Sequence, residues 1–199
     1  MSETGAAHDW RVPGHYGAAA TGVVFAEAMI ECAWNVQGEF RRADFTAEVQ
    51  RRFGVALPVV PNTTARTDAA TALWLGPTSW LLLARNDSSS AGFEATRDAL
   101  AAVGGAVFDV SASRVAWTIA GVDARRILAK SCPLDFHPRA FPPRTCARSL
   151  FGHVNALYVN DGESFAMMVA RSFSRDVWYA LSTSAAPHGC EVKAPAPYG

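Results

Sequence analysis

The sequence has little charge and no excess of either sign. Only 18% of its 199 residues are charged, and 18 Lys and Arg residues balance 18 Asp and Glu residues. Proteins that bind nucleic acid or anionic membranes normally carry a basic surface that attracts phosphate groups. The balanced charge therefore argues against nucleic acid and against a membrane surface as partners.

Long apolar runs and targeting signals are also missing. No stretch reaches the roughly 18 consecutive apolar residues that cross a bilayer. Residues 1–22 lack the basic region that begins a secretory signal. We therefore expect a cytoplasmic protein.

Signatures of metal, redox and nucleotide sites are absent too. The four cysteines form no CxxC pair, and no GxGxxG or GxxxxGK motif is present. Zinc cages and redox dithiols need paired cysteines, and phosphate-binding loops need glycines at those spacings. We expect four free thiols, at Cys32, Cys132, Cys146 and Cys190.

Aromatic residues are abundant by contrast. They make up 11% of the chain, with six Trp and eleven Phe, and half of all residues are hydrophobic. Aromatics gather at the centres of protein interfaces, where charged residues are depleted. The composition favours a subunit of a larger assembly, and an unusually large core explains it equally well.

Apolar periodicity predicts strands that come in adjacent pairs between helices. The predicted strands are 29–36, 73–75, 80–83, 107–110, 114–120, 154–159 and 165–170, and the predicted helices are 45–53, 93–103, 123–130 and 172–181. Asp44 is expected to cap the first helix. Three tight pairs are expected, 73–75 with 80–83, 107–110 with 114–120, and 154–159 with 165–170. Paired strands between helices indicate an α+β fold with mixed or antiparallel sheets.

The two ends of the sequence lack periodicity. We expect a flexible tail over residues 1–28, one α+β domain over residues 29–183, and a second tail over residues 184–199. Within the domain, prolines prevent a helix over residues 56–64, which we expect to be an ordered or semi-ordered connector.

A second irregular segment, residues 131–148, contains prolines at positions 133, 138, 142 and 143. Irregular segments of this length are uncommon in compact domains unless they have a function. We expect a partner chain to cover it. Because buried aromatic and arginine side chains dominate protein interfaces, the expected anchors are Leu134, Phe136, Arg139 and Phe141.

The same segment holds one candidate ligand site. Asp135 and His137 stand two residues apart, so an extended backbone would point both side chains to the same side. A carboxylate that orients an imidazole is a familiar catalytic pair. The alternative is that Asp135 fixes a turn and His137 bonds to backbone, as loop polar groups commonly do.

Several stretches together resemble the gamma subunit of heterotetrameric sarcosine oxidase. They are ALPVVPNTT at 56–64, LWLGPTSWLLLA at 73–84, DVSASRVAWTIAG at 109–121, CPLDFHPRAFPPRTCARSLFGHVNALYV at 132–159 and RSFSRDVWYAL at 171–181. The long stretch at residues 132–159 is the part of the resemblance that is specific to this family. The chain departs from the family at Thr78 and Ser79, where an acidic pair is common.

The resemblance implies a complex of alpha, beta, gamma and delta chains that demethylates sarcosine to glycine, producing hydrogen peroxide. The one-carbon unit passes to tetrahydrofolate or leaves as formaldehyde. FAD and FMN are expected on the beta chain, NAD and tetrahydrofolate on alpha, and zinc on delta. No cofactor and no catalytic residue is expected on this chain. Its implied fold is similar to the folate-binding domain of aminomethyltransferases, and fold does not by itself transfer activity.

Two alternatives stay open. The chain is a stand-alone folate-binding one-carbon protein, or it is the gamma subunit of a related N-methyl amino acid oxidase or dehydrogenase. The first alternative lacks support in one respect, because the K-G-C-Y-x-G-Q-E signature of folate-binding repair proteins is present only in fragments at residues 130–133. The sequence does not separate sarcosine from other N-methyl amino acids as the substrate.

Overall fold

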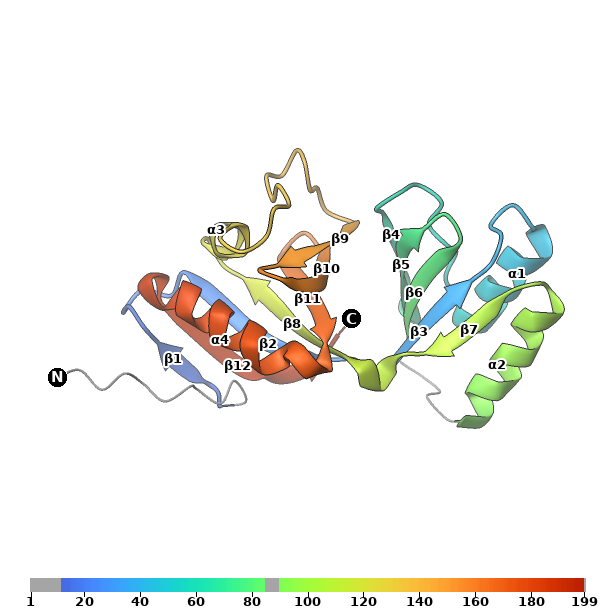
Figure 1. Ribbon diagram of the computed structural model, residues 1–199, viewed down its shortest axis with the longest axis horizontal. Coiled ribbons are helices and arrows are strands. Elements are labelled where there is room, and N and C mark those ends of the chain that lie inside the picture. Colours follow the sequence, from blue (N-terminus) through green and yellow to red (C-terminus); the bar gives the residue numbers. More distant parts are fainter. Residues whose placement is uncertain (1–11, 85–89, 199) are drawn as a thin grey trace. The chain divides into compact units, whose positions relative to one another are not determined.

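The computed structural model describes residues 12–84 and 90–198 (Figure 1). The described chain forms two compact units where the sequence suggested one domain. Unit 1 contains residues up to 29, residues 115–143 and residues 148–196, and unit 2 contains residues 30–114 and 144–147 with the last residues of the chain. Both units combine a sheet with helices, which confirms the expected α+β class.

Unit 2 is built on a five-stranded antiparallel sheet. The strand order is β4 (Thr64–Arg66), β5 (Ala70–Gly76), β6 (Ser79–Ala84), β3 (Cys32–Gln37) and β7 (Ala106–Asp109). Its helices are α1 (Ala43–Phe53) and α2 (Ser90–Ala102). Phe45 from α1, Leu100 from α2 and Trp80 from β6 are fully buried in one apolar cluster.

Helix α1 follows the expected spacing of apolar residues. Phe45, Val49 and Phe53 recur every fourth residue and are buried. Gly54 ends the helix in the left-handed conformation, with a φ of 67°. The predicted cap is wrong, because the helix begins one residue before Asp44, whose carboxylate instead pairs with Arg42 at 2.6 Å.

Unit 1 is built on a seven-stranded sheet. The strand order is β1 (Gly14–Tyr16), β12 (Cys190–Pro197), β2 (Val23–Met29), β8 (Arg114–Ala120), β11 (Ser164–Ala170), β10 (Val154–Asn160) and β9 (Thr145–Phe151). Its helices are α3 (Ala124–Ala129), α4 (Ser174–Ala185) and the short 3-10 helices η2 (Arg171–Phe173) and η3 (Ala186–His188), whereas the 3-10 helix η1 (Ser111–Ser113) lies in unit 2. Trp178 of α4 packs against Phe25 and Trp117, so α4 covers the β2–β8 part of the sheet.

The expected tails contain three of these strands, so the predicted domain boundaries are wrong where the structure describes them. Val23 and Phe25 of β2 are fully buried. β12 lies between β1 and β2, with Cys190 and Val192 facing inward. The sharp entry into β12 requires Gly189, because a Cβ there would lie 1.8 Å from the Ala20 carbonyl oxygen.

Two of the three predicted strand pairs are confirmed. β5 pairs with β6 and β10 pairs with β11, each antiparallel. The third is wrong, because β7 pairs with β3 whereas β8 pairs with β2. Helix η1 separates β7 from β8, and the Val110 amide bonds the Ala33 carbonyl at 2.9 Å. This bond holds the end of β7 beside β3.

Candidate interaction site

The segment between α3 and β9 has no helix or strand over residues 131–143, which we call the proline-rich loop. Residues 145–148, expected to be irregular, already belong to β9. The loop begins directly after α3, where the Ser131 amide bonds the Leu128 carbonyl at 3.2 Å and the Ser131 carbonyl accepts from Gly152 at 2.6 Å. The loop is therefore tied to the sheet at its first residue.

Two phenylalanines of the proline-rich loop point into the core of unit 1. Phe136 and Phe141 are each 3% exposed. Phe136 lies edge-on to Phe141, Tyr158 and Phe165 at ring distances of 5.4–5.8 Å, and Phe141 stacks on Phe165 at 6.3 Å. Such pairs add to the stability gained by burying the rings.

This placement corrects the expectation that Phe136 and Phe141 anchor a partner chain. Both rings are already covered by the chain's own strands β10 and β11. A side chain without exposed area has none to bury against a second protein. The two rings fix the loop to its own unit instead.

Two polar side chains hold the backbone beside these rings. Asn160, which is 1% exposed, donates from Nδ2 to the Phe141 carbonyl at 2.7 Å. Arg125 donates from Nε to the Phe136 carbonyl at 3.1 Å, and its guanidinium lies 5.2 Å from the centre of the Phe165 ring. Both ends of the loop tip, residues 137–140, are thereby held in place.

Asp135 and His137 both bond to the backbone of the tip. The Asp135 carboxylate accepts from the His137 amide at 2.8 Å, and His137 Nδ1 accepts from the Arg139 amide at 3.2 Å. The His137 carbonyl accepts from the amides of Ala140 and Phe141, both at 2.9 Å. These bonds form the turn that was the alternative to a catalytic pair. A ligand at Asp135 and His137 stays a prediction.

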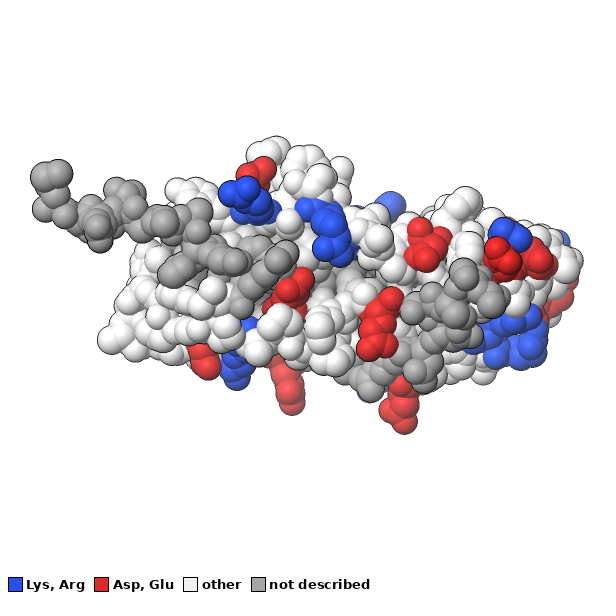
Figure 2. Space-filling model, turned by 90° about the horizontal axis from the view of Figure 1, so that it is seen from below, with Lys and Arg blue, Asp and Glu red and all other residues white. Residues whose placement is uncertain are grey.

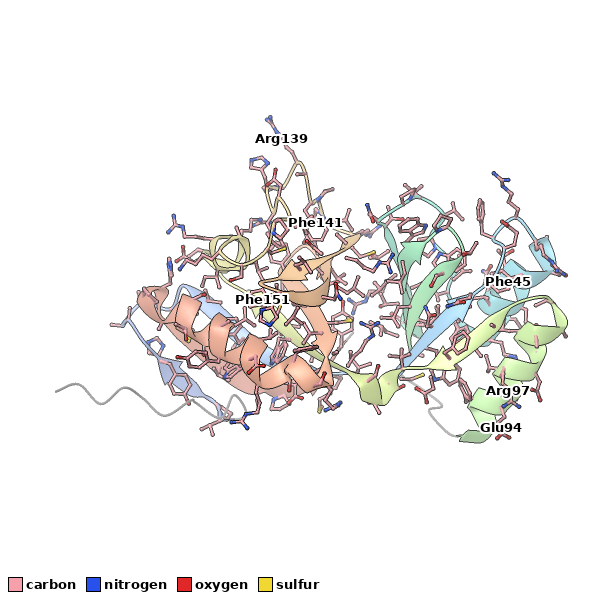
Figure 3. All side chains as sticks on the ribbon, viewed as in Figure 1. Phe45, Glu94, Arg97, Arg139, Phe141 and Phe151 are labelled. Carbon is pink, nitrogen blue, oxygen red and sulfur yellow. The ribbon has the colours of Figure 1, made fainter. Side chains whose placement is uncertain are left out.

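The remaining expected anchors are accessible. Arg139 is exposed and extends from the outer end of the loop, whereas Phe141 lies at its base (Figure 3). Leu134 is half-buried, and its amide donates to Cys132 Sγ at 3.4 Å. An interface role for Leu134 and Arg139 stays a prediction.

Two of the buried cysteines, Cys146 and Cys190, are poor nucleophiles. All four cysteines are free and buried. Burial raises the pKa of the Cys146 thiol to about 11 and also raises the pKa of Cys190. Burial, together with a hydrogen bond to Cys132, raises the pKa of Tyr158. Cys146 and Cys190 therefore stay protonated at neutral pH, where a thiolate would be needed for attack.

The described residues hold no obvious metal site or membrane span. Within residues 12–84 and 90–198, no three His, Cys, Asp or Glu side chains are placed to hold a metal ion. No described helix is both long and apolar enough to cross a bilayer. Figure 2 shows one face, on which charged side chains of both signs are scattered among larger uncharged areas.

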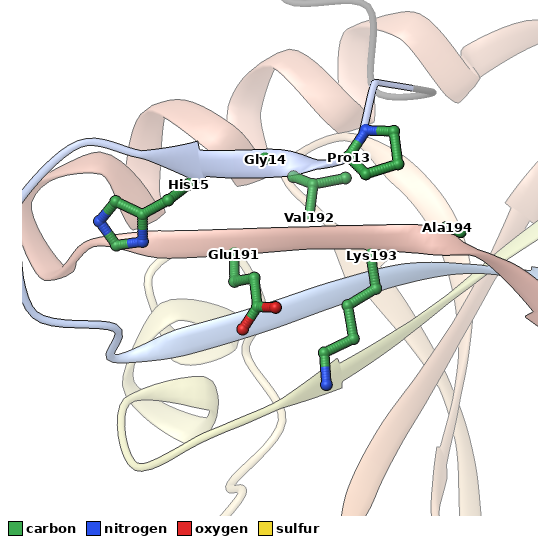
Figure 4. A pocket seen from close by; sticks show the side chains of 7 residues that line it. All are labelled: Pro13, Gly14, His15, Glu191, Val192, Lys193 and Ala194. Atoms are coloured by element: carbon green, nitrogen blue, oxygen red, sulfur yellow. The ribbon is translucent and has the colours of Figure 1, made fainter.

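A surface depression of about 490 Å³ lies along β1 and β12 (Figure 4). Its walls are Pro13, Gly14, His15, Glu191, Val192, Lys193 and Ala194. The side chains of Glu191 and Lys193 leave the same side of β12, as alternate residues of a strand do. The depression lies in segments that were expected to be tails, so a pocket was not expected there. Alternation of Cys190 and Val192 with Glu191 and Lys193 was the available signal for β12.

Comparison with known families decides the classification. The model of the sarcosine oxidase gamma subunit family matches residues 37–187. The chain belongs to this family. A sarcosine oxidase subunit gamma from an Arthrobacter species is 34% identical over 131 residues. That alignment covers 64% of this chain and 62% of the relative, so it spans less than two thirds of the relative's length.

Two solved structures extend the comparison to the fold. A chain of the heterotetrameric sarcosine oxidase from Corynebacterium sp. U-96, solved with pyrrole 2-carboxylate, is 26% identical with a TM-score of 0.74, covering 86% of this chain and 89% of that one. Aminomethyltransferase T of the glycine cleavage system from Bartonella henselae is 11% identical with a TM-score of 0.58, covering 81% of this chain and 46% of that one. The second likeness concerns the fold alone and agrees with the expected architecture.

Proposed function

We propose that this chain is a non-catalytic gamma subunit of a heterotetrameric sarcosine oxidase, assembled with alpha, beta and delta chains. The complex would convert sarcosine to glycine and hydrogen peroxide, with formaldehyde or 5,10-methylenetetrahydrofolate as the one-carbon product. Membership of the gamma-subunit family and the likeness to a chain of a heterotetrameric relative support this proposal.

The observation that carries the proposal is that the proline-rich loop is held from within and exposed at its tip. Phe136 and Phe141 are buried at its base, while Pro138 and Arg139 lie at the surface. A segment that is ordered before binding loses little conformational entropy when a partner covers it. The role proposed for the tip is to dock against a larger chain through Arg139 and Leu134.

The redox chemistry is proposed to lie on the other chains. FAD, FMN, NAD, tetrahydrofolate and zinc are each assigned to a partner subunit. The side chains of Asp135 and His137 bond to the loop backbone, and Cys146 and Cys190 are buried. The cytoplasmic location expected from the sequence belongs to the same proposal.

Co-expression with the three partner chains tests the proposal. We expect the chain to be poorly soluble alone and to co-purify with its partners as a four-chain complex. Arg139→Ala should weaken assembly several-fold, because an arginine at an interface centre contributes strongly to binding. Arg97→Ala, an exposed position on α2, is the matched control and should assemble like the wild type. A stable monomer that ignores the partner chains would contradict the proposal.

A folate titration separates the proposal from a stand-alone role. Calorimetry of the isolated chain with a reduced folate should show no saturable heat. Saturable binding would favour a folate-binding one-carbon protein. The assembled complex should then be assayed with sarcosine and other N-methyl amino acids, because the substrate pocket is proposed to lie on another chain.

A further inference from the structure

An acid, an imidazole and an amine meet in unit 1, beside the entry to β12. Asp123 directly precedes α3, Lys130 directly follows it, and His188 is the last residue of η3. His188 Nδ1 lies 3.3 Å from Asp123 Oδ2, and His188 Nε2 lies 3.2 Å from Lys130 Nζ. We call these three residues the imidazole cluster. Its central ring bridges a carboxylate and a primary amine.

The two contacts of His188 agree on one tautomer of its ring. A lysine ammonium has only donors, so His188 Nε2 accepts from Lys130 through its lone pair. Nδ1 then carries the ring proton and donates it to Asp123, whose other carboxylate oxygen binds Arg126 at 3.1 Å. In this arrangement the imidazole is neutral, and its basic nitrogen faces the amine.

Backbone bonds hold the imidazole cluster in place. The Gly22 amide donates to the His188 carbonyl at 2.9 Å, and the Asp123 amide donates to the Gly22 carbonyl at 3.0 Å. Lys130 Nζ also donates to the Ser184 carbonyl at 2.9 Å. The side chains of His188 and Asp123 are only 17% and 21% exposed, whereas Lys130 is exposed. The base is therefore fixed, and the amine is accessible to small solutes.

The imidazole cluster has the parts of an activated amine nucleophile. A lysine ammonium is not nucleophilic, and it becomes so when a neighbouring base takes its proton. A base that a third group orients is the recurring geometry of such sites. Addition of an amine to an aldehyde needs only groups that move protons, whereas acyl transfer also needs donors for an oxyanion. The chemistry present therefore favours a small aldehyde as the ligand.

We propose that Lys130 is a reversible covalent binding site for a small aldehyde, with His188 as its base and Asp123 as a positioning residue. His188 Nε2 takes a proton from Lys130 Nζ, and the amine nitrogen bonds to the carbonyl carbon. The resulting oxyanion receives that proton from His188, which gives a carbinolamine with a protonated nitrogen. Transfer of a second proton from this nitrogen to the hydroxyl releases water and leaves a protonated imine.

The binding reaction is balanced without any other reactant. The carbon–oxygen bond breaks as the carbon–nitrogen double bond forms, and water carries away the oxygen. Addition of water reverses each step, so no oxidant or reductant is consumed. The site is a property of this chain in addition to the proposed function, and it does not depend on that function.

The chain contains its own control, because its two lysines are Lys130 and Lys193. Lys193 is exposed on β12, on the same side of the strand as Glu191 (Figure 4). The full-length chain is incubated with acetaldehyde and cyanoborohydride, which reduces an imine to a stable ethylamine. Peptide mass spectrometry then gives the rate of ethylation at each lysine. Lys130 should react about tenfold faster than Lys193 or more, since a general base contributes roughly 10²–10⁴-fold. Equal rates would overturn the proposal.

Two variants test the roles of the other residues. His188→Gln keeps an acceptor for Lys130 but removes the base, so it should slow ethylation of Lys130 about tenfold or more and that of Lys193 less than about twofold. In the wild type, the advantage of Lys130 should shrink at acidic pH, because a protonated imidazole takes no proton. Asp123→Asn no longer fixes the tautomer, so this advantage should become small at every pH. A merely structural role for Asp123 would leave the pH profile unchanged.

The outcomes separate this inference from misfolding and from the proposed function. Circular dichroism spectra and melting temperatures show whether the variants are folded, and the comparison of the two lysines in the wild type needs no variant. A folded His188→Gln chain that reacts like the wild type would overturn the proposal, because Lys130 would then react as an ordinary exposed amine. The ethylation rates are measured without partner chains, so a negative result overturns this inference alone.

Discussion

The proline-rich loop and residues 55–63, which we call the valine connector, place similar kinds of residue in opposite directions. Both lack regular structure, contain prolines and carry large apolar side chains. In the loop, Phe136 and Phe141 turn inward and a charged residue, Arg139, occupies the tip. In the connector, Pro58 is buried, and Val59 and Val60 face solvent.

The difference follows from what lies beneath each segment. The loop crosses Phe165 and Tyr158, whose rings accept further aromatic partners. The connector is attached through backbone carbonyls, to Trp80 at Pro58 and to Thr63 at Val60. At the valine pair these carbonyl bonds leave both side chains facing outward, whereas Val55 and Leu57 at the start of the connector pack into the core of unit 2. Mutations at the anchors should therefore affect the two segments differently.

The largest expected effect is at the base of the loop. Phe136→Ala removes a ring that contacts three others, and we expect it to lower the free energy of unfolding by about 3–5 kcal/mol. Urea unfolding of the dilute chain measures this. Val60→Ala, the equivalent truncation in the connector, should cost less than about 0.5 kcal/mol. Equal losses would show that the two segments are anchored alike.

The second prediction concerns the end of the connector. The Cys146 thiol lies 3.4 Å from the carbonyls of Thr63 and Trp74. Burial raises its pKa from 9.0 to about 11. The unfolded thiol ionises first as pH rises, so this contribution to stability is complete below pH 9. It should fall by roughly 2–3 kcal/mol between about pH 9 and pH 11.

Cys146→Ser is the control for this pH dependence. Serine keeps a hydroxyl donor for the two carbonyls and does not ionise in this range. Its unfolding free energy should therefore fall less than that of the wild type between pH 9 and pH 11, while Tyr158 affects both proteins equally. Parallel pH profiles for the two proteins would refute a buried, protonated Cys146.

The third prediction concerns the polar anchor of the loop. Asn160→Ala leaves the Phe141 carbonyl without its donor, and we expect a loss of roughly 1–3 kcal/mol. The backbone of the tip should also become more mobile. Hydrogen exchange should therefore quicken at the amides of Ala140 and Phe141, with the amides of the connector as an internal control. Faster exchange at both segments would point to global destabilisation instead.

The smallest effect is expected at the tip. Arg139→Ala should change the free energy of unfolding of the isolated chain by less than about 0.5 kcal/mol, because the side chain is exposed. The same variant is expected to weaken assembly. Thermal unfolding and co-purification of one preparation would separate the two roles. A large loss of stability would mean that Arg139 supports the fold and would weaken the case for docking.

Local patterns in the sequence predicted the elements that depend on local contacts. Strand β8 was predicted with its observed bounds, and the hairpin of β10 and β11 follows from the turn at Asp161 and Gly162. Helix α1 follows from Phe45, Val49 and Phe53. Each of these elements is specified by residues that lie close together in the sequence.

Non-local pairing explains most of the errors. β12 is held between β1 and β2, from the other end of the chain, so nothing nearby in the sequence specifies its partners. The same is true of β7, which pairs with β3 although β8 follows it directly. At the candidate site, the roles of Arg125 and Asn160 were not predicted. Each donates a hydrogen bond to a backbone carbonyl, and because every residue has such a carbonyl, no sequence pattern marks the bond. Phe136 and Phe141 were predicted to matter in the loop, but the sequence did not show that their rings point into the core of unit 1.

The position of β12 also constrains how the chain acquires its structure during synthesis. β1 and β2 are made long before the strand that joins them, which follows residue 189. Until then, the edge of β2 that β12 will occupy has open hydrogen-bonding groups, which can pair with other chains. The nascent chain would therefore need protection over residues 14–29 until β12 has been made.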